Sequence, residues 1–139
     1  MVVDADCLIA GVLTFQGATS QLLDVWGQGA FELVVCPQLI FEVRKALLSP
    51  RIAGRYRVAR DDAEGFAKQL AEEALLADDP RDPPRVVPDD PKDDYLVALT
   101  LASSADLLVT RDKHFEEVQV RGFAIVGPRE ALDQVATSI

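Results

Sequence analysis

The stretch PDDPKDDYLVALTLASSADLLVTRD, residues 88–112, passes from a dense group of aspartates into a long apolar run. DYLVALTLASSAD predicts a buried helix, and LLVT predicts a strand that ends in polar residues. Four carboxylates, at positions 89, 90, 93 and 94, stand just before or at the start of that helix. Carboxylates this close repel one another unless water or a cation stabilises them. The stretch therefore indicates either a solvated helix start or a cation site.

Short apolar runs alternate with amphipathic segments along the rest of the chain. Strands are predicted at Val2–Val3, within FELVVCP (31–37), and within GFAIVGP (122–128), with a brief one at Val86–Val87. Helices are predicted directly after Asp4, in 19–29, in 38–48, after a basic loop in 60–77, and in 129–136. This alternation predicts an α/β fold, with helices on both faces of a central, mainly parallel sheet.

Composition limits the class of protein. A chain of 139 residues with 49% hydrophobic and 27% charged residues predicts a single globular domain over residues 1–139. No apolar run approaches the roughly 20 residues of a membrane helix, and Asp4 interrupts any signal-like start. We therefore expect a cytoplasmic protein.

The cysteines and the histidine exclude several kinds of site. Cys7 and Cys36 lie far apart with no CxxC motif, and His114 is the only histidine. This pattern disfavours a zinc site, a disulfide framework and any mechanism that needs two histidines.

Acidic residues from four distant segments are expected at one edge of the sheet. Right-handed crossovers bring the carboxyl ends of parallel strands together, and ligands bind there. The residues predicted to meet are Asp4, Glu42, Asp93 and Asp112. Each has an ordinary alternative, such as a helix cap, a helix surface or a turn. An oxygen-only set suits Mg²⁺ or Mn²⁺, which can support phosphodiester hydrolysis.

The motifs VVDAD, FEV, DDPKDDYLVALTLASSADLLVTRD and GFAIVGPREAL closely resemble the PIN-domain family, in particular the toxins of VapBC-type toxin–antitoxin pairs. The likeness runs from about Val2 to Leu132. It implies a three-layer α/β/α sandwich and a Mg²⁺- or Mn²⁺-dependent ribonuclease acting on single-stranded RNA. The resemblance also implies a cognate antitoxin, whose peptide keeps the toxin inactive. It further implies a homodimer, to which Trp26, Phe31 and Phe41 could contribute.

The resemblance also implies roles for individual residues. Asp4, Asp93 and Asp112 match the family's metal-binding aspartates, and Glu42 matches its glutamate, as a ligand or as the base that orients water. Supporting positions, or second choices, are Asp6, Thr110, Asp90 and Asp94. The chain reads Asp4-Ala5-Asp6 where members commonly read Asp-Thr-Asn, so a threonine hydroxyl is missing and a carboxylate is added.

The charge distribution supplies candidates for RNA contacts. The net charge is −9, yet residues 43–60 contain no acidic side chain. The candidates for binding RNA phosphates are Arg44, Lys45, Arg51 and Arg55. The alternative is a solvated loop and helix face.

Two other functions stay open on sequence grounds. DADCL after a strand also resembles haloacid-dehalogenase-type phosphatases, with Asp4 as a covalent nucleophile, although no Gly-Thr follows Asp6. A PIN-like domain that binds a partner without catalysis is the third possibility, and the intact acidic set argues against it.

Overall fold

The computed structural model describes residues 1–14, 16–81, 94–115, 118, 120 and 122–138. In this part of the chain five short strands form two parallel sheets. One sheet has the order β1-β4-β5, and the other pairs β2 with β3. The strands are β1 (Val2–Val3), β2 (Val34–Val35), β3 (Leu75–Leu76), β4 (Leu107–Val109) and β5 (Ala124–Val126).

Backbone hydrogen bonds align the strands and join the two sheets. Val2 is opposite Leu108 in the β1–β4 pair, and the amide of Asp4 extends that pair by donating to the carbonyl of Val109 at 3.0 Å. The amide of Val34 donates to the carbonyl of Met1 at 2.8 Å, which sets β2 beside β1. Because β1 and β4 are parallel neighbours, the residues that follow them emerge at the same edge.

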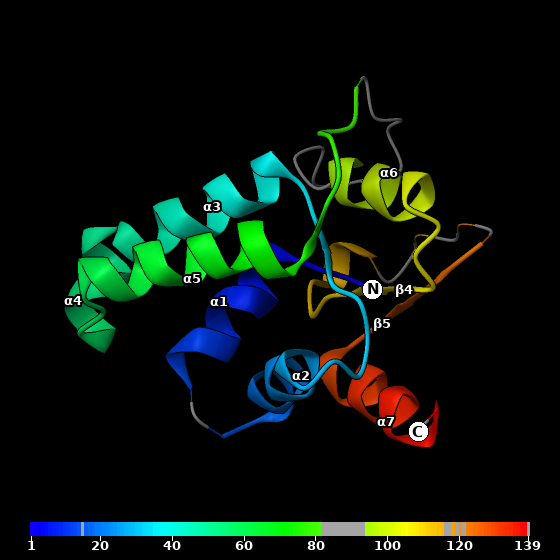
Figure 1. The fold of residues 1–139 in the computed structure, drawn as a ribbon, viewed down its shortest axis with the longest axis horizontal. Coiled ribbons are helices and arrows are strands. Elements are labelled where there is room, and N and C mark those ends of the chain that lie inside the picture. The colour runs from blue at the N-terminus through cyan, green and yellow to red at the C-terminus, as the bar shows by residue number, and fades with distance from the viewer. Residues whose placement is uncertain (15, 82–93, 116–117, 119, 121, 139) are drawn as a thin grey trace.

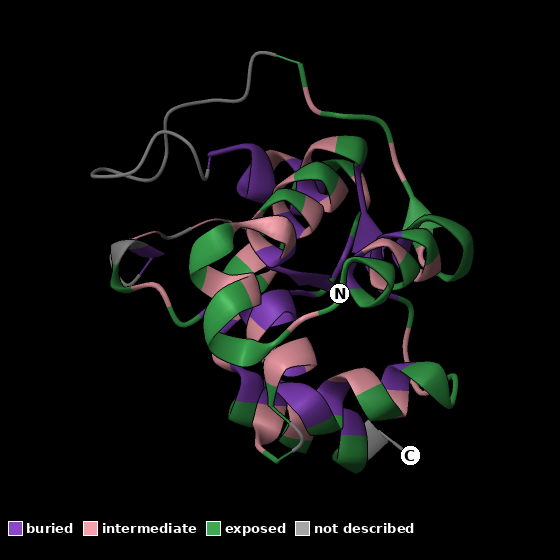
Figure 2. Ribbon diagram, turned by 90° about the vertical axis from the view of Figure 1, so that its left-hand side faces the viewer, coloured by how far each residue is buried: buried purple, intermediate pink, exposed green. Residues whose placement is uncertain are grey.

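Helices cover the sheet on both sides. In Figure 1, α6 lies on one side of β4, and α2 and α7 lie on the other. Figure 2 shows buried residues along the strands and on the inward faces of the helices. This arrangement confirms the predicted α/β/α architecture. The helices are α1 (Ala5–Leu13), α2 (Ala18–Gly27), α3 (Pro37–Leu48), α4 (Pro50–Tyr56), α5 (Arg60–Glu73), α6 (Asp94–Ala102) and α7 (Pro128–Ser138), with a short 3₁₀ helix, η2 (Lys113–Phe115).

Local sequence explains the helices that carry the acidic residues. Pro37 begins α3, where its fixed φ is favourable and no amide partner is required. Leu39, Val43 and Leu47 recur at helical spacing and are buried, so Glu42 is carried at the flank of the inward stripe. The α6 helix is apolar on almost every side, and most of its apolar residues are accordingly buried.

Three sequence-based expectations need correction. The basic segment that follows α3 is not a loop, because Ser49 caps the short helix α4 within it. Leu75 and Leu76 do not continue α5 but form β3, in which the amide of Leu75 donates to the carbonyl of Leu33 at 2.8 Å. Trp26 is only 7% exposed and belongs to the core, so it offers little surface to a dimer interface, whereas Phe41 is 58% exposed.

The predicted strand at Val86–Val87 lies outside the described residues. No helix in the described part of the chain combines the length and apolar character needed to cross a membrane.

Candidate functional site

Thr110 links two of the predicted acidic residues at the carboxyl edge of the sheet. Asp4 follows β1 and Asp112 lies three residues beyond the end of β4. The hydroxyl of Thr110 donates to Oδ2 of Asp4 and accepts from the backbone amide of Asp112 at 3.0 Å. One side chain therefore fixes the geometry of both strand ends, and the supporting role of Thr110 in a site stays a prediction.

Asp4 is a buried carboxyl, only 5% exposed. Its Oδ1 accepts from the amide of Cys7 at 2.8 Å and so caps α1. Burial raises the pKa of Asp4 above its ordinary value, while the hydrogen bonds from Thr110 and Cys7 lower it in part and the nearby Asp6 adds to the rise. A cation close to this carboxyl would stabilise its charged form.

A hollow of about 240 Å³, which we call the acidic hollow, lies beside Asp4. Its lining residues are Asp4, Asp6, Cys7, Ala10, Arg111 and Asp112. Asp4, Asp6 and Asp112 supply its carboxylates. Burial raises the pKa of the thiol of Cys7, which also lines the hollow. The remaining charged residue of the lining is Arg111, which the sequence analysis did not single out although it stands between Thr110 and Asp112.

Glu42, on α3, accepts one hydrogen bond from α6 and one from its own helix. The hydroxyl of Tyr95 donates to Oε2 of Glu42 at 2.6 Å, and the side-chain amide of Gln38 donates to Oε1 at 3.5 Å. Tyr95 directly follows Asp94, which is buried as the first residue of α6. A hydrogen bond from the second residue of α6 therefore fixes the carboxylate of Glu42. The sequence does not single out Tyr95, because it stands in the apolar run of α6.

Among the described residues, the predicted acids fall into two groups. One group contains Asp4, Asp6 and Asp112, and the other contains Glu42, which is hydrogen-bonded to α6. Asp90 and Asp93 lie outside the described residues. Among the side chains that the structure describes, no group of three or more Asp, Glu, His or Cys residues could hold a metal ion. The oxygen donors fit a hard cation in kind, but a single cluster of Asp4, Glu42, Asp93 and Asp112 stays a prediction.

The basic candidates lie on α3 and α4. Arg44 is already engaged, because its Nη2 lies 2.6 Å from Oε1 of Glu64 on α5. Lys45, Arg51 and Arg55 are exposed. Their contact with RNA stays a prediction.

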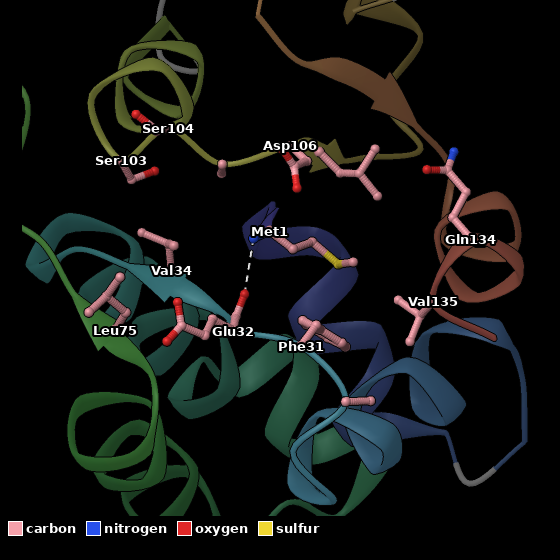
Figure 3. Close-up of a pocket in the computed structure, with 13 residues that line it drawn as sticks. Met1, Phe31, Glu32, Val34, Leu75, Ser103, Ser104, Asp106, Gln134 and Val135 are labelled. Carbon is pink, nitrogen blue, oxygen red and sulfur yellow. Dashed lines mark hydrogen bonds between the residues drawn. The ribbon is translucent and has the colours of Figure 1, made fainter. Parts of the chain in front are cut away.

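Another hollow, of about 380 Å³, lies at the opposite, amino edge of the sheet (Figure 3). Glu32 and Asp106 line it together with the amino group of Met1. Both carboxylates act to raise the pKa of that amine, although burial has the larger effect and lowers it. This hollow is separate from the carboxyl edge.

Comparison with known proteins agrees with this geometry. The family model described as the PIN domain matches residues 1–114, most of the chain. The chain therefore belongs to the PIN domain family, whose members are generally nucleases. Neither the curated proteins nor the solved structures contain a significant match to this chain.

Proposed function

We propose that this protein is a Mg²⁺- or Mn²⁺-dependent ribonuclease that hydrolyses phosphodiester bonds of single-stranded or structured RNA. Its membership of the PIN family supports nuclease activity. The observation that carries the proposal is the Thr110 bridge between Asp4 and Asp112 at the edge of a parallel sheet. Two carboxyl-bearing strand ends held in this way form the rigid base that a phosphodiester site needs.

Each acidic residue has a separate task in this proposal. Asp4, Asp93 and Asp112 are the residues that would hold the metal ion, directly or through water. When bound, the ion supplies charge neutralisation at the scissile phosphate and a more acidic water. Glu42 completes the set as a ligand or as the base that orients water, and the Tyr95 hydrogen bond at 2.6 Å fixes its carboxylate. Asp6, Asp90 and Asp94 are supporting acids.

The biological role that we propose is that of a cytoplasmic VapC-like toxin. A cognate antitoxin would then place a segment over the acidic edge. A homodimer is also part of the proposal, and Phe41 is an exposed apolar side chain that suits an interface. A direct check is whether expression of the chain stops cell growth and whether a neighbouring gene restores it.

Two observations favour the nuclease over the phosphatase. PIN membership is one. The other is that both oxygens of Asp4 already accept hydrogen bonds, from Cys7 and Thr110. Such a carboxyl is suited to remain in place as a ligand and is poorly arranged to attack phosphorus as a covalent nucleophile.

The test is cleavage of end-labelled single-stranded RNA with Mg²⁺ or Mn²⁺ and with EDTA. We expect the wild type to cut only with metal, and Asp4→Asn and Asp93→Asn to lose activity while their circular dichroism is unchanged. Asp24→Asn, on the exposed face of α2, is the matched control for loss of one carboxylate. Cleavage by both site variants at the wild-type rate would refute the proposed site. A phosphorylated Asp4 trapped with a phosphomonoester would favour the phosphatase.

A further inference from the structure

Arg111 is tied to the carboxyl edge by a buried partner. Its Nη2 donates to Oγ1 of Thr19 at 3.0 Å. Thr19 belongs to α2 and is only 2% exposed, so this anchor is part of the core. The side chain of Arg111 therefore has a defined direction even though the residue itself is exposed.

Three hollows meet at Arg111. It lines the acidic hollow, a hollow of about 470 Å³ at the start of α7, and one of about 300 Å³ between η2 and β5. Arg111 is therefore part of the wall shared by these three hollows. The position suits contact with a polymer.

The carboxylates of the acidic hollow repel a phosphate, so a phosphate bound there needs a positively charged group beside it. Its carboxylates come from Asp4, Asp6 and Asp112, and Arg111 is the one basic residue in its described lining. Ion pairs between described residues join Arg44 to Glu64 and Lys68 to Glu72. Arg111 forms none with a described carboxylate. Its charge is therefore not neutralised by an ion pair within that part of the molecule.

We infer that Arg111 binds a non-bridging oxygen of an RNA backbone phosphate at the acidic hollow. A guanidinium has five N–H donors in a planar fork, and one of them is used by Thr19. The others match the paired oxygens of a phosphate. The inference rests on the proposed ribonuclease function and adds a positioning residue that holds the strand without reading its sequence.

The test measures binding apart from cleavage. The affinity of a fluorescent single-stranded RNA is followed by anisotropy over a series of salt concentrations, with Asp4→Asn protein in EDTA. Wild-type protein in EDTA replaces it if the variant does not fold. With Arg111→Gln added, we expect affinity to fall about tenfold or more at low salt. The slope of log affinity against log salt should become shallower by about 0.7 to 1, which corresponds to one phosphate contact.

Matched variants separate a phosphate contact from a structural role. Lys68→Gln removes one exposed positive charge from α5 and should leave both affinity and slope unchanged. Arg111→Lys keeps the charge and should retain the slope while it loses part of the affinity. Thr19→Val removes the anchor but not the charge, so the slope should also persist.

The outcomes are distinguishable. An unchanged salt slope in Arg111→Gln would overturn the inference, whether or not affinity falls. A fall in affinity that Thr19→Val reproduces, with lower thermal stability and the same slope, would show that Arg111 only anchors α2. If the wild type cuts no RNA but its binding depends on Arg111 as expected, the ribonuclease proposal fails and the phosphate contact stands.

Discussion

At the scale of single residues, the site depends on a hydroxyl as much as on carboxylates. Thr110 is buried, donates to Asp4 and accepts from the amide of Asp112. Thr110 was a supporting candidate because the resemblance to the PIN family implied it. The sequence did not predict Arg111 or Tyr95, because their roles come from contacts with α2 and α3 that no local pattern specifies.

Thr110→Val is the substitution that isolates this hydroxyl. Valine keeps the shape of threonine but leaves Oδ2 of Asp4 and the amide of Asp112 without that partner. We expect a loss of about 1–3 kcal/mol in the free energy of unfolding, which is the range for an unsatisfied buried polar group. RNA cleavage should fall as well. Urea unfolding of Thr110→Val against Thr110→Ser, which keeps the hydroxyl, checks this; equal stability of the two variants would contradict it.

Asp4 should make the stability of the protein depend on pH. Burial raises the pKa of its carboxyl, so the native state holds the proton more tightly than the unfolded state does. The stability contribution of Asp4 therefore falls as pH rises through the window between the ordinary and the raised pKa, and it remains unfavourable above that window. In metal-free buffer the stability of Asp4→Asn relative to the wild type should therefore rise from acidic pH to pH 7, because asparagine carries no buried charge. Asparagine still caps α1 well but keeps only one of the two hydrogen-bond acceptors.

The thermal unfolding of both proteins against pH measures this effect. The stability of Asp4→Asn relative to the wild type should fall as pH falls toward the ordinary pKa of an aspartate, because native Asp4 then becomes protonated. A stability difference that grows on acidification would show that the carboxyl is stabilised in its charged form.

At the scale of elements, periodicity identified the strands and helices that have clear apolar patterns. It failed at α4 and β3 for different reasons. The α4 helix has no buried residue, so no apolar stripe marks it, and it depends on the Ser49 cap and Pro50. The β3 strand consists of two leucines at the end of a helical pattern. Only pairing with β2 makes them a strand, and pairing is a tertiary effect.

Proline substitution can verify β3. The amide of Leu75 donates to the carbonyl of Leu33, and the amide of Ala77 donates to Val35, both at 2.8 Å, so the alternation directs the amide of Leu76 to the open edge. Leu75→Pro should destabilise the protein by about 1–3 kcal/mol more than Leu76→Pro, since it alone breaks a ladder bond. Both leucines are 51% exposed, so the loss of apolar contacts is matched. Equal unfolding free energies would mean that the pairing with β2 is absent.

At the scale of the whole molecule, the parallel sheet separates two edges that carry different sets of charged groups. The carboxyl edge carries Asp4, Asp6 and Asp112, while the amino edge carries Glu32 and Asp106 beside the Met1 amine. The sequence predicted the carboxyl edge from the direction of the strands alone. It did not predict the hydrogen bond from Tyr95 to Glu42, because that bond depends on how α6 lies against α3.

This separation leads to a prediction for metal binding that does not depend on RNA. A cation that binds only the folded state raises stability by RT ln(1 + [L]/Kd), about 2.7 kcal/mol at a hundredfold excess over Kd. Mn²⁺ should therefore raise the melting temperature of the wild type in proportion to the logarithm of its concentration. Asp4→Asn and Asp112→Asn should reduce this response, because each removes a carboxylate from the acidic hollow.

Asp106→Asn is the control at the amino edge and should respond to Mn²⁺ as the wild type does. It also removes one carboxylate, so any change in general electrostatic attraction is matched among the three variants. A response lost in Asp106→Asn but kept in Asp4→Asn would put the cation at the amino edge. The Thr110 bridge would then be structural, because the residues that it aligns would have no cation to hold. A response reduced by both carboxyl-edge variants and unaffected by Asp106→Asn would instead tie the cation to the edge that Thr110 organises.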